Sequence, residues 1–195
     1  LAGSLEPTSG TVERRLGLST GWMPQRPSHY GRLSARQNLE LFARLANLAD
    51  PHGLATRALT AHEIPDDGRS SAALSLGNRQ RLSLAIASLG DPDVLLLDEP
   101  TASLDLGYQL EIAGLLRRLN RERGTTMVIS THDLNLAAGL CDRVVLLKHG
   151  RVLADGATAD TITPESIARA YGVDADVRFH PDAGHLTVTP LARRH

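Results

Sequence analysis

The chain has 195 residues, with 21 Lys and Arg against 22 Asp and Glu and a formal net charge of −1. Hydrophobic residues make up 42% of it and charged residues 22%, which excludes the composition of a disordered chain and suits one domain with a buried core. The balanced charge argues against binding of nucleic acid through the overall charge of the protein. No apolar run approaches the roughly 18–20 residues that span a bilayer. Cys141 is the only cysteine, which excludes an internal disulfide framework and fits a reducing compartment.

The first half of the chain is predicted to pass from a short strand into helices. Turn-forming residues at 6–10 precede a predicted strand over residues 16–22. From residue 34, apolar side chains recur at three- and four-residue steps, which indicates an amphipathic helix. Residues 50–71 are rich in polar and helix-breaking residues, so we expect a loop-rich, partly helical stretch there. Ser75 then stands where an N-cap would, ahead of a helical run.

The second half of the chain alternates predicted strands with predicted helices. Residues 94–97 and 126–130 are continuous apolar runs, typical of strands that are buried on both faces of a parallel sheet. Helices are expected at 79–89, 107–123 and 134–139, a third strand at 143–148, its return at 151–154, and a terminal hairpin from 173–179 and 186–189. This alternation predicts an α/β layered domain, whose ligands gather beyond the carboxyl ends of its strands.

Two adjacent carboxylates, Asp98 and Glu99, follow the predicted strand at 94–97. Delivering two acids to the end of a buried strand is costly unless they meet a cation or activate water. In nucleotide hydrolases the first such acid holds Mg²⁺, and the second can accept a proton from the attacking water. A strand that simply ends in solvated acids is the alternative, and this motif alone leaves it open.

A second motif occupies residues 74–81, directly before a predicted helix. Ser75, Gly77 and the first unpaired N–H groups of that helix form a plausible anion cradle, because a helix N-terminus offers free donors and a positive dipole end. Taken alone, Ser-x-Gly before a helix is more often a plain N-cap. Its distance from the acids changes this, since Ser75 lies 23 positions before Asp98.

Five motifs in this chain resemble, in order and spacing, those of ATP-binding cassette (ABC) ATPases. They are Gln25, the signature at 74–81, the strand end at 98–100, the segment 103–105, and His132. The resemblance covers essentially the whole chain. It implies an α/β, P-loop NTPase-like layered sheet with a helical subdomain at about 34–90, and it implies ATP and Mg²⁺ as ligands.

The resemblance implies a role for each matching residue before the acids. Gln25 looks like the loop glutamine that senses Mg²⁺ and the γ-phosphate and couples them to a transmembrane partner. Ser75 and Gly77 look like the signature residues that clasp the γ-phosphate of ATP bound on the opposite subunit. Leu76 and Asn78 depart from the commonest signature, which has Gly and Gln at these places, but the two residues that make the contacts remain.

The later motifs receive their roles in the same way. Asp98 resembles the acid on the Mg²⁺ side, and Glu99 resembles the general base. Asp105 looks like the residue that communicates across the dimer. His132 resembles the switch histidine that contacts the γ-phosphate, and its place directly after the predicted strand at 126–130 suits a polar ring aimed out of a sheet.

The chain contains no G-x-x-x-x-G-K-[ST] loop, which supplies the backbone donors and the Lys that hold the β- and γ-phosphates. The family places this loop a little before the position where the sequence starts, so we expect a fold truncated at its N-terminus. On this interpretation residues 1–172 are a partial ATPase domain, and residues 173–195 are a C-terminal β-hairpin extension. The 195 residues alone are expected neither to bind ATP tightly nor to hydrolyse it.

Partners and location follow from the resemblance. Cassette ATPases work as pairs, so a homodimer with a second ATPase subunit is implied, together with a transmembrane permease subunit that docks near residues 26–36. A substrate-binding protein is a further candidate partner, and no nucleic acid is expected. The implied place is the cytoplasmic face of the cell membrane, as a peripheral subunit.

The nature of the cargo is left open by the sequence. Residues 131–138, 163–165 and 171–174 resemble importers of iron–siderophore, haem or cobalamin, whereas Leu76 and residues 33–45 resemble drug-type and cytochrome-maturation exporters. Import is favoured. Two other classes stay open: a cassette protein of translation or DNA repair, and a non-hydrolysing relic that has lost its P-loop.

Overall fold

The computed structural model describes residues 7–13, 17–26 and 28–193. They form two compact units, divided between Ser130 and Thr131, and each unit is described by itself. Within the described residues, no helix has the length and apolar character that crossing a membrane requires.

A three-stranded parallel sheet lies at the centre of the first unit. Its strands are β1 (Thr20–Met23), β2 (Val94–Asp98) and β3 (Thr126–Ser130), in the order β1-β2-β3. The register pairs Met23 with Leu97 and Asp98 with Ser130, so the three strands end at the same edge. The predicted strands are therefore present, although the part of 16–22 before residue 17 lies outside the described residues.

The prediction that β3 is buried on both faces is wrong. Thr126, Val128 and Ser130 are exposed, and the residues between them are half-buried. Among the described residues β3 pairs only with β2, and the exposed and covered positions alternate, so one face of this edge strand is covered and the other is not. In the central strand β2, by contrast, Leu95 and Leu97 are buried.

Three helices with their own apolar core form the helical part of the first unit. They are α1 (Ala35–Leu45), α2 (Pro51–Ala61) and α3 (Leu76–Ala87), with a 3₁₀ turn at Ser71–Ala73. Ser34 caps α1 through a reciprocal capping box with Gln37, and Asp50 caps α2 ahead of Pro51 at its first position. The shared core is built from Ala35, Leu39, Ala55, Leu59, Ile64, Leu74, Leu82 and Ala85. The stretch at 50–71 is thus more helical than a loop-rich region, because its first residues supply a start signal.

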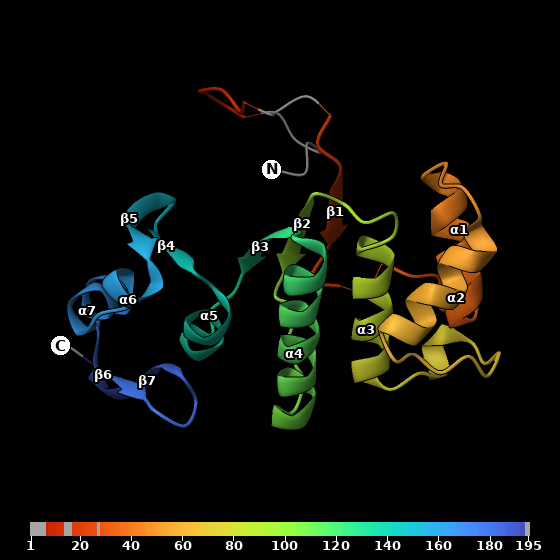
Figure 1. Ribbon diagram of the computed structural model, residues 1–195. Coiled ribbons are helices and arrows are strands. Elements are labelled where there is room, and N and C mark those ends of the chain that lie inside the picture. Colours follow the sequence, from red (N-terminus) through yellow and green to blue (C-terminus); the bar gives the residue numbers. More distant parts are fainter. Residues whose placement is uncertain (1–6, 14–16, 27, 194–195) are drawn as a thin grey trace. The chain divides into compact units, whose positions relative to one another are not determined.

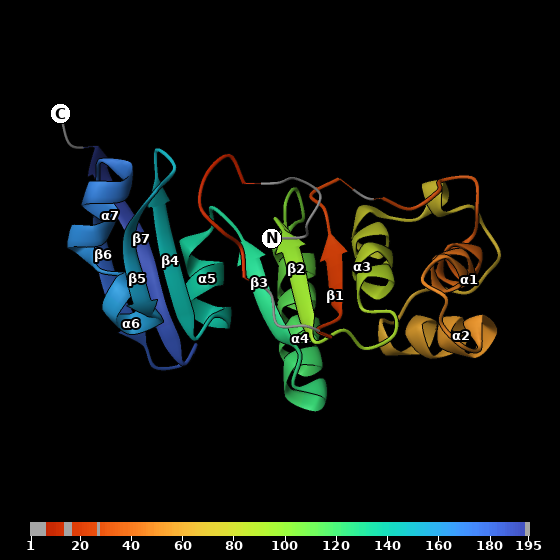
Figure 2. The ribbon, with the colours of Figure 1, turned by 90° about the horizontal axis from the view of Figure 1, so that it is seen from above.

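The longest helix of the first unit is α4 (Leu106–Arg123), close to the prediction. It starts at Asp105, whose carboxylate accepts the N–H of Tyr108 at 3.0 Å, and it ends at Gly124, whose φ of +65° is the left-handed conformation of a C-cap. Figures 1 and 2 both place α4 beside β2 and next to α3.

The second unit combines short helices with two antiparallel hairpins. Its elements are α5 (Leu134–Leu140), β4 (Arg143–Lys148), β5 (Arg151–Ala157), α6 (Thr158–Thr161), α7 (Pro164–Tyr171), β6 (Val173–His180) and β7 (His185–Arg193). The β4–β5 turn has positive φ at both His149 and Gly150, as a tight hairpin turn requires. The predicted terminal hairpin is present as β6–β7, and Asn135 of α5 exchanges two hydrogen bonds with the backbone of Val188 in β7, at 3.2 and 2.7 Å.

Candidate functional site

The two acids predicted from the sequence stand at the carboxyl end of β2. Asp98 is the last residue of the strand and pairs with Ser130, whose hydroxyl donates a hydrogen bond to its Oδ1 atom. The N–H of Glu99 donates to the carbonyl of Ser130 at 3.0 Å. Glu99 has a φ of +48°, a left-handed conformation that is costly for any residue with a Cβ. The chain therefore turns sharply between the two carboxylates, and such strain is frequent at functional sites.

A tight segment connects Glu99 to α4. Pro100 and Thr101 are buried, and the N–H of Ala102 donates to the carbonyl of Glu99 at 3.0 Å. The segment ends at Asp105, an exposed residue whose carboxylate caps α4. Capping accounts for one oxygen of Asp105 and leaves acceptor capacity on the carboxylate.

The signature begins at the N-terminus of α3, as predicted. The hydroxyl of Ser75 accepts the N–H of Asn78 at 3.2 Å, so this residue is a true N-cap. The cap uses a lone pair of the hydroxyl oxygen, and the hydroxyl proton is still available to a phosphate oxygen. The plain N-cap and the anion cradle are therefore compatible interpretations of the same residue.

A buried glutamine joins the signature to the segment after the acids. Gln80 is 4% exposed, and its side-chain amide donates to the carbonyl of Pro100 at 3.0 Å. Neither Gln80 nor Ser130 was predicted from the sequence to support the site. Each contacts a residue far away in the sequence: Gln80 contacts Pro100, 20 positions later, and Ser130 contacts Asp98, 32 positions earlier. No local sequence pattern relates such partners.

The first unit brings several predicted site residues to one edge of its sheet. Gln25 is exposed and follows β1, whose Met23 pairs with Leu97, so it leaves the sheet at the edge where Asp98 stands. His132 is the second residue of the second unit, two positions after Ser130, and it is exposed. Its role at the γ-phosphate stays a prediction, as do the roles of the other site residues.

The donors at this edge fit a magnesium ion that arrives with a nucleotide. Among the described residues, no group of three or more His, Cys, Asp or Glu side chains is placed to hold a metal ion. Mg²⁺ does not need one, because it is usually held by one or two carboxylates, waters and the phosphates of its substrate. The Asp98 carboxylate, oriented by Ser130, and the amide oxygen of Gln25 suit this kind of site.

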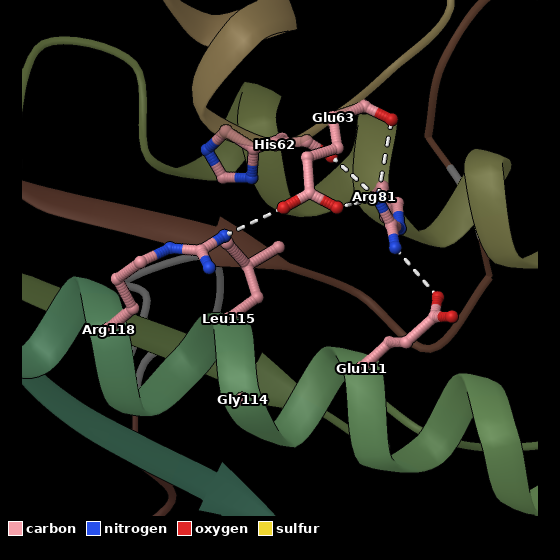
Figure 3. Close-up of a pocket in the computed structure, with 7 residues that line it drawn as sticks. All are labelled: His62, Glu63, Arg81, Glu111, Gly114, Leu115 and Arg118. Atoms are coloured by element: carbon pink, nitrogen blue, oxygen red, sulfur yellow. Dashed lines mark hydrogen bonds and ion pairs between the residues drawn. The ribbon is translucent and has the colours of Figure 1, made fainter.

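A hollow of about 270 Å³ lies beside α3 and α4 and contains an ion-pair network (Figure 3). Arg81 of α3 pairs with Glu63 at 3.0 Å and with Glu111 of α4 at 2.7 Å, and Arg118 of α4 approaches Glu63 at 3.6 Å. The residues that line it are His62, Glu63, Arg81, Glu111, Gly114, Leu115 and Arg118. Arg81 thus fastens α3 to α4 on the helical side of the unit.

His62 lines the same hollow and is 1% exposed. Burial lowers its pKa to about 3, and the positive charges of Arg123, Arg118 and Arg81 act in the same direction. Its Nε2 atom lies 3.1 Å from the hydroxyl of Ser88. The imidazole is therefore neutral at physiological pH, and it is a buried structural group.

Comparison with known protein families decides the class of this chain. The family model described as ABC transporter matches residues 1–102. The hemin import ATP-binding protein HmuV of Bordetella avium is 36% identical over 212 residues, which cover 96% of this chain and 81% of that protein. The chain belongs to the ABC transporter family. The iron(3+)-hydroxamate import ATP-binding protein FhuC of Bacillus subtilis is 43% identical over 109 residues, or 56% of this chain and 40% of that protein.

Solved structures of ABC transporter proteins share the fold. An inward-facing transporter described as of the metal-chelate type matches with a TM-score of 0.85 and 25% identity, over 97% of this chain and 78% of that chain. A dimeric ATP-binding cassette bound to ADP and phosphate matches with a TM-score of 0.62 and 30% identity, over 71% of this chain and 62% of that chain. The predicted family, the α/β P-loop NTPase-like fold and the ABC ATPase class are confirmed, and membership of the ABC family implies nucleotide binding.

Proposed function

We propose that this chain is the ATP-binding and ATP-hydrolysing part of an importer for iron–siderophore, haem or cobalamin. The observation that carries this proposal is the extent of the similarity. The metal-chelate type transporter matches 97% of the chain, whereas three solved structures of two other ABC proteins match 71–77% of it. The similarity to HmuV likewise covers 96% of the chain, so both likenesses extend into the second unit with its terminal hairpin. This favours import over the export alternative.

The site residues divide the chemistry of ATP hydrolysis between them. Glu99 takes a proton from the water that attacks the γ-phosphate, since a Glu carboxylate can act as a general base. Asp98 would hold Mg²⁺ together with Gln25, and the Ser130 hydroxyl fixes the orientation of the Asp98 carboxylate. Mg²⁺, when bound, would supply positive charge that neutralises the phosphate oxygens.

The signature acts on ATP that a second copy of the chain holds. The Ser75 hydroxyl and the N–H groups of the first turn of α3 donate to the γ-phosphate, and the positive end of the helix dipole favours the anion. Asp105 communicates between the two ATP sites of the dimer, and His132 contacts the γ-phosphate. ATP then favours the closed dimer, and hydrolysis removes the contacts that hold it closed.

The remaining assignments are proposed on the same basis. The chain docks on a membrane permease subunit near residues 26–36, lies at the cytoplasmic face of the membrane, and works with a substrate-binding protein. Residues 1–172 belong to the ATPase domain, within which 34–90 are the helical subdomain, and residues 173–195 are an extension.

Transport in vesicles tests the proposal. The protein expressed from its complete gene is reconstituted with its permease subunit. ATP supplied on the side of the ATPase is expected to drive accumulation of a ferric siderophore, haem or cobalamin into the compartment that contains ATP. The Glu99→Gln variant, which keeps the shape of the side chain, is the matched control and is expected to abolish accumulation. Movement of cargo away from the ATP side would instead assign the chain to an exporter.

A further inference from the structure

The first turn of α3 packs directly against an aromatic ring of α4. A Cβ atom added to Gly77 would lie 2.4 Å from Cδ1 and 2.5 Å from Cε1 of Tyr108, closer than real atoms approach. Gly77 has no positive φ, so its backbone conformation does not itself require glycine. Within this chain, the ring of Tyr108 is what excludes a side chain at position 77.

The ring of Tyr108 is attached to a well-fixed piece of backbone. The N–H of Tyr108 donates to the carboxylate of Asp105 at 3.0 Å, and the Gln109 side chain donates to the carbonyl of Leu104 at 3.2 Å. Tyr108 itself is half-buried. The ring therefore stands one helical turn from Asp105, on the N-terminal turn of α4, and moves with the Asp105 segment.

Two further contacts come from the same face of α3. Gln80 and Arg81 lie three and four residues after Gly77, which places all three on one side of the helix. Gln80 donates to the carbonyl of Pro100 at 3.0 Å, and Arg81 pairs with Glu111 at 2.7 Å. The Arg81 pair holds α3 against α4, and the Gln80 hydrogen bond holds α3 against the segment that precedes α4. The ring contact sets the distance between the two helices at the end of α3 that carries Ser75.

We propose that Tyr108 is a positioning residue that holds the signature turn at a fixed place relative to Asp105. This proposal rests on the proposed function, because the aligned groups are the Ser75 hydroxyl and the N–H groups that meet the γ-phosphate of ATP on a second copy. The contact with Gly77 is made by ring carbons, so an aromatic ring is what the site needs and the phenolic hydroxyl is dispensable. Through this contact, a shift of the Asp105 segment moves the signature turn.

Single substitutions at Tyr108 in the complete protein test the role of the ring. Tyr108→Phe keeps the ring carbons, and its ATP turnover is expected within about twofold of the unaltered protein. Tyr108→Ala is expected to lower kcat by about 10- to 100-fold, since misplacing reacting groups by about 1 Å costs this much, while KM for ATP changes by less than about threefold. Leu110→Ala, which removes an exposed side chain from the same helix, is the matched control.

A double substitution separates the ring contact from a general loss of folding. In a Glu99→Gln background, which slows hydrolysis, ATP-dependent dimer formation is measured by light scattering. Gly77→Ala alone is expected to prevent the dimer because its Cβ meets the ring. Adding Tyr108→Ala removes the obstacle, and dimer formation is expected to recover at least about tenfold relative to Gly77→Ala alone.

The results distinguish the two proposals. If the Glu99→Gln protein with Gly77 and Tyr108 intact forms no ATP-dependent dimer, the proposed function fails. If that dimer forms, but Tyr108→Ala turns over ATP like the unaltered protein and does not relieve Gly77→Ala, the positioning role is wrong. Tyr108→Phe and Tyr108→Leu are also compared for thermal unfolding and for ATP turnover. If both unfold at the same temperature and only Tyr108→Leu has lower turnover, the result supports the role of the ring.

Discussion

Ser130 and Asp98 occupy paired positions at the ends of neighbouring parallel strands, and the Ser130 hydroxyl donates a hydrogen bond to the Asp98 carboxylate. The backbone of Ser130 accepts a second hydrogen bond, from the N–H of Glu99 at 3.0 Å. One residue of β3 therefore orients both acids of the proposed site. A carboxylate that is fixed by such a partner loses less freedom when it binds a metal ion.

Removing the Ser130 hydroxyl is expected to weaken the magnesium site. In the complete protein, Ser130→Ala should lower ATP turnover by about 10-fold and raise the Mg²⁺ concentration needed for half-maximal activity, because outer-shell partners of this kind typically contribute 10- to 100-fold. Ser130→Thr retains a hydroxyl and is the matched control. A Mg²⁺ dependence of Ser130→Ala equal to that of the unaltered protein would contradict the assigned role.

Substitutions at Ser75 separate the cap from the phosphate contact. Ser75→Ala removes the acceptor of the Asn78 N–H and should lower the free energy of unfolding by about 1 kcal/mol. Ser75→Asp keeps a good N-cap and should leave stability nearly unchanged, yet its negative charge should abolish the ATP-dependent dimer by repelling the γ-phosphate. Urea unfolding and light scattering give the two readouts. A Ser75→Asp protein that dimerises normally would rule out a phosphate contact at this residue.

His62 is expected to make the protein sensitive to acid. Its pKa in the folded protein is lowered to about 3 by burial, from an ordinary value of 6.5. Below about pH 6.5, His62 is protonated in the unfolded chain but stays neutral in the folded protein. The contribution of His62 to the free energy of unfolding is therefore unchanged above this pH and falls as the pH decreases towards 3. The expected loss from His62 is about 2 kcal/mol between pH 7 and pH 5.

The His62→Gln variant is the control for this effect, since it cannot titrate in this range. Urea unfolding of both proteins at several pH values gives the comparison. The unaltered protein should lose stability more steeply than His62→Gln as the pH falls below about 6.5. Parallel pH profiles for the two proteins would show that His62 is not buried in the neutral form.

Two glycines of the same helix are expected to respond in opposite directions to alanine. A Cβ on Gly114, inside α4, would meet nothing within 4 Å, so Gly114→Ala should raise the free energy of unfolding by about 0.5–1 kcal/mol. Gly124 ends the helix with a φ of +65°, and Gly124→Ala should lower the free energy of unfolding by about 1 kcal/mol. A lower free energy of unfolding for Gly114→Ala would contradict the open space around the Cβ position of Gly114.

Local signals in the sequence were sufficient for most elements of the fold. The apolar run before Asp98 predicted β2, the Ser75 cap predicted the start of α3, and the alternation after residue 173 predicted the terminal hairpin. Each of these features depends on residues that are close together in the chain. The exposure of Val128 could not be predicted in this way, because it depends on which elements cover β3.

The support around the site could not be predicted for the same reason. Ser130 of β3 donates a hydrogen bond to Asp98 of the neighbouring strand β2. Tyr108 of α4 leaves no space for a side chain at Gly77 of α3. Arg81 meets Glu111 across 30 positions of sequence. No periodic pattern relates such partners. The motifs predicted the residues of the proposed site, and only the fold showed which other residues contact them.

The central claim is that two copies of the complete protein enclose ATP between them and that Glu99 is the general base whose action ends this ATP-bound state. The most direct measurement is the mass of the complete Glu99→Gln protein in solution, with and without ATP. The account predicts a monomer without ATP, a stable dimer that retains ATP, and turnover reduced by about 10²- to 10⁴-fold, as expected for loss of a general base. Undiminished turnover by Glu99→Gln, or a protein that stays monomeric in ATP, would contradict it.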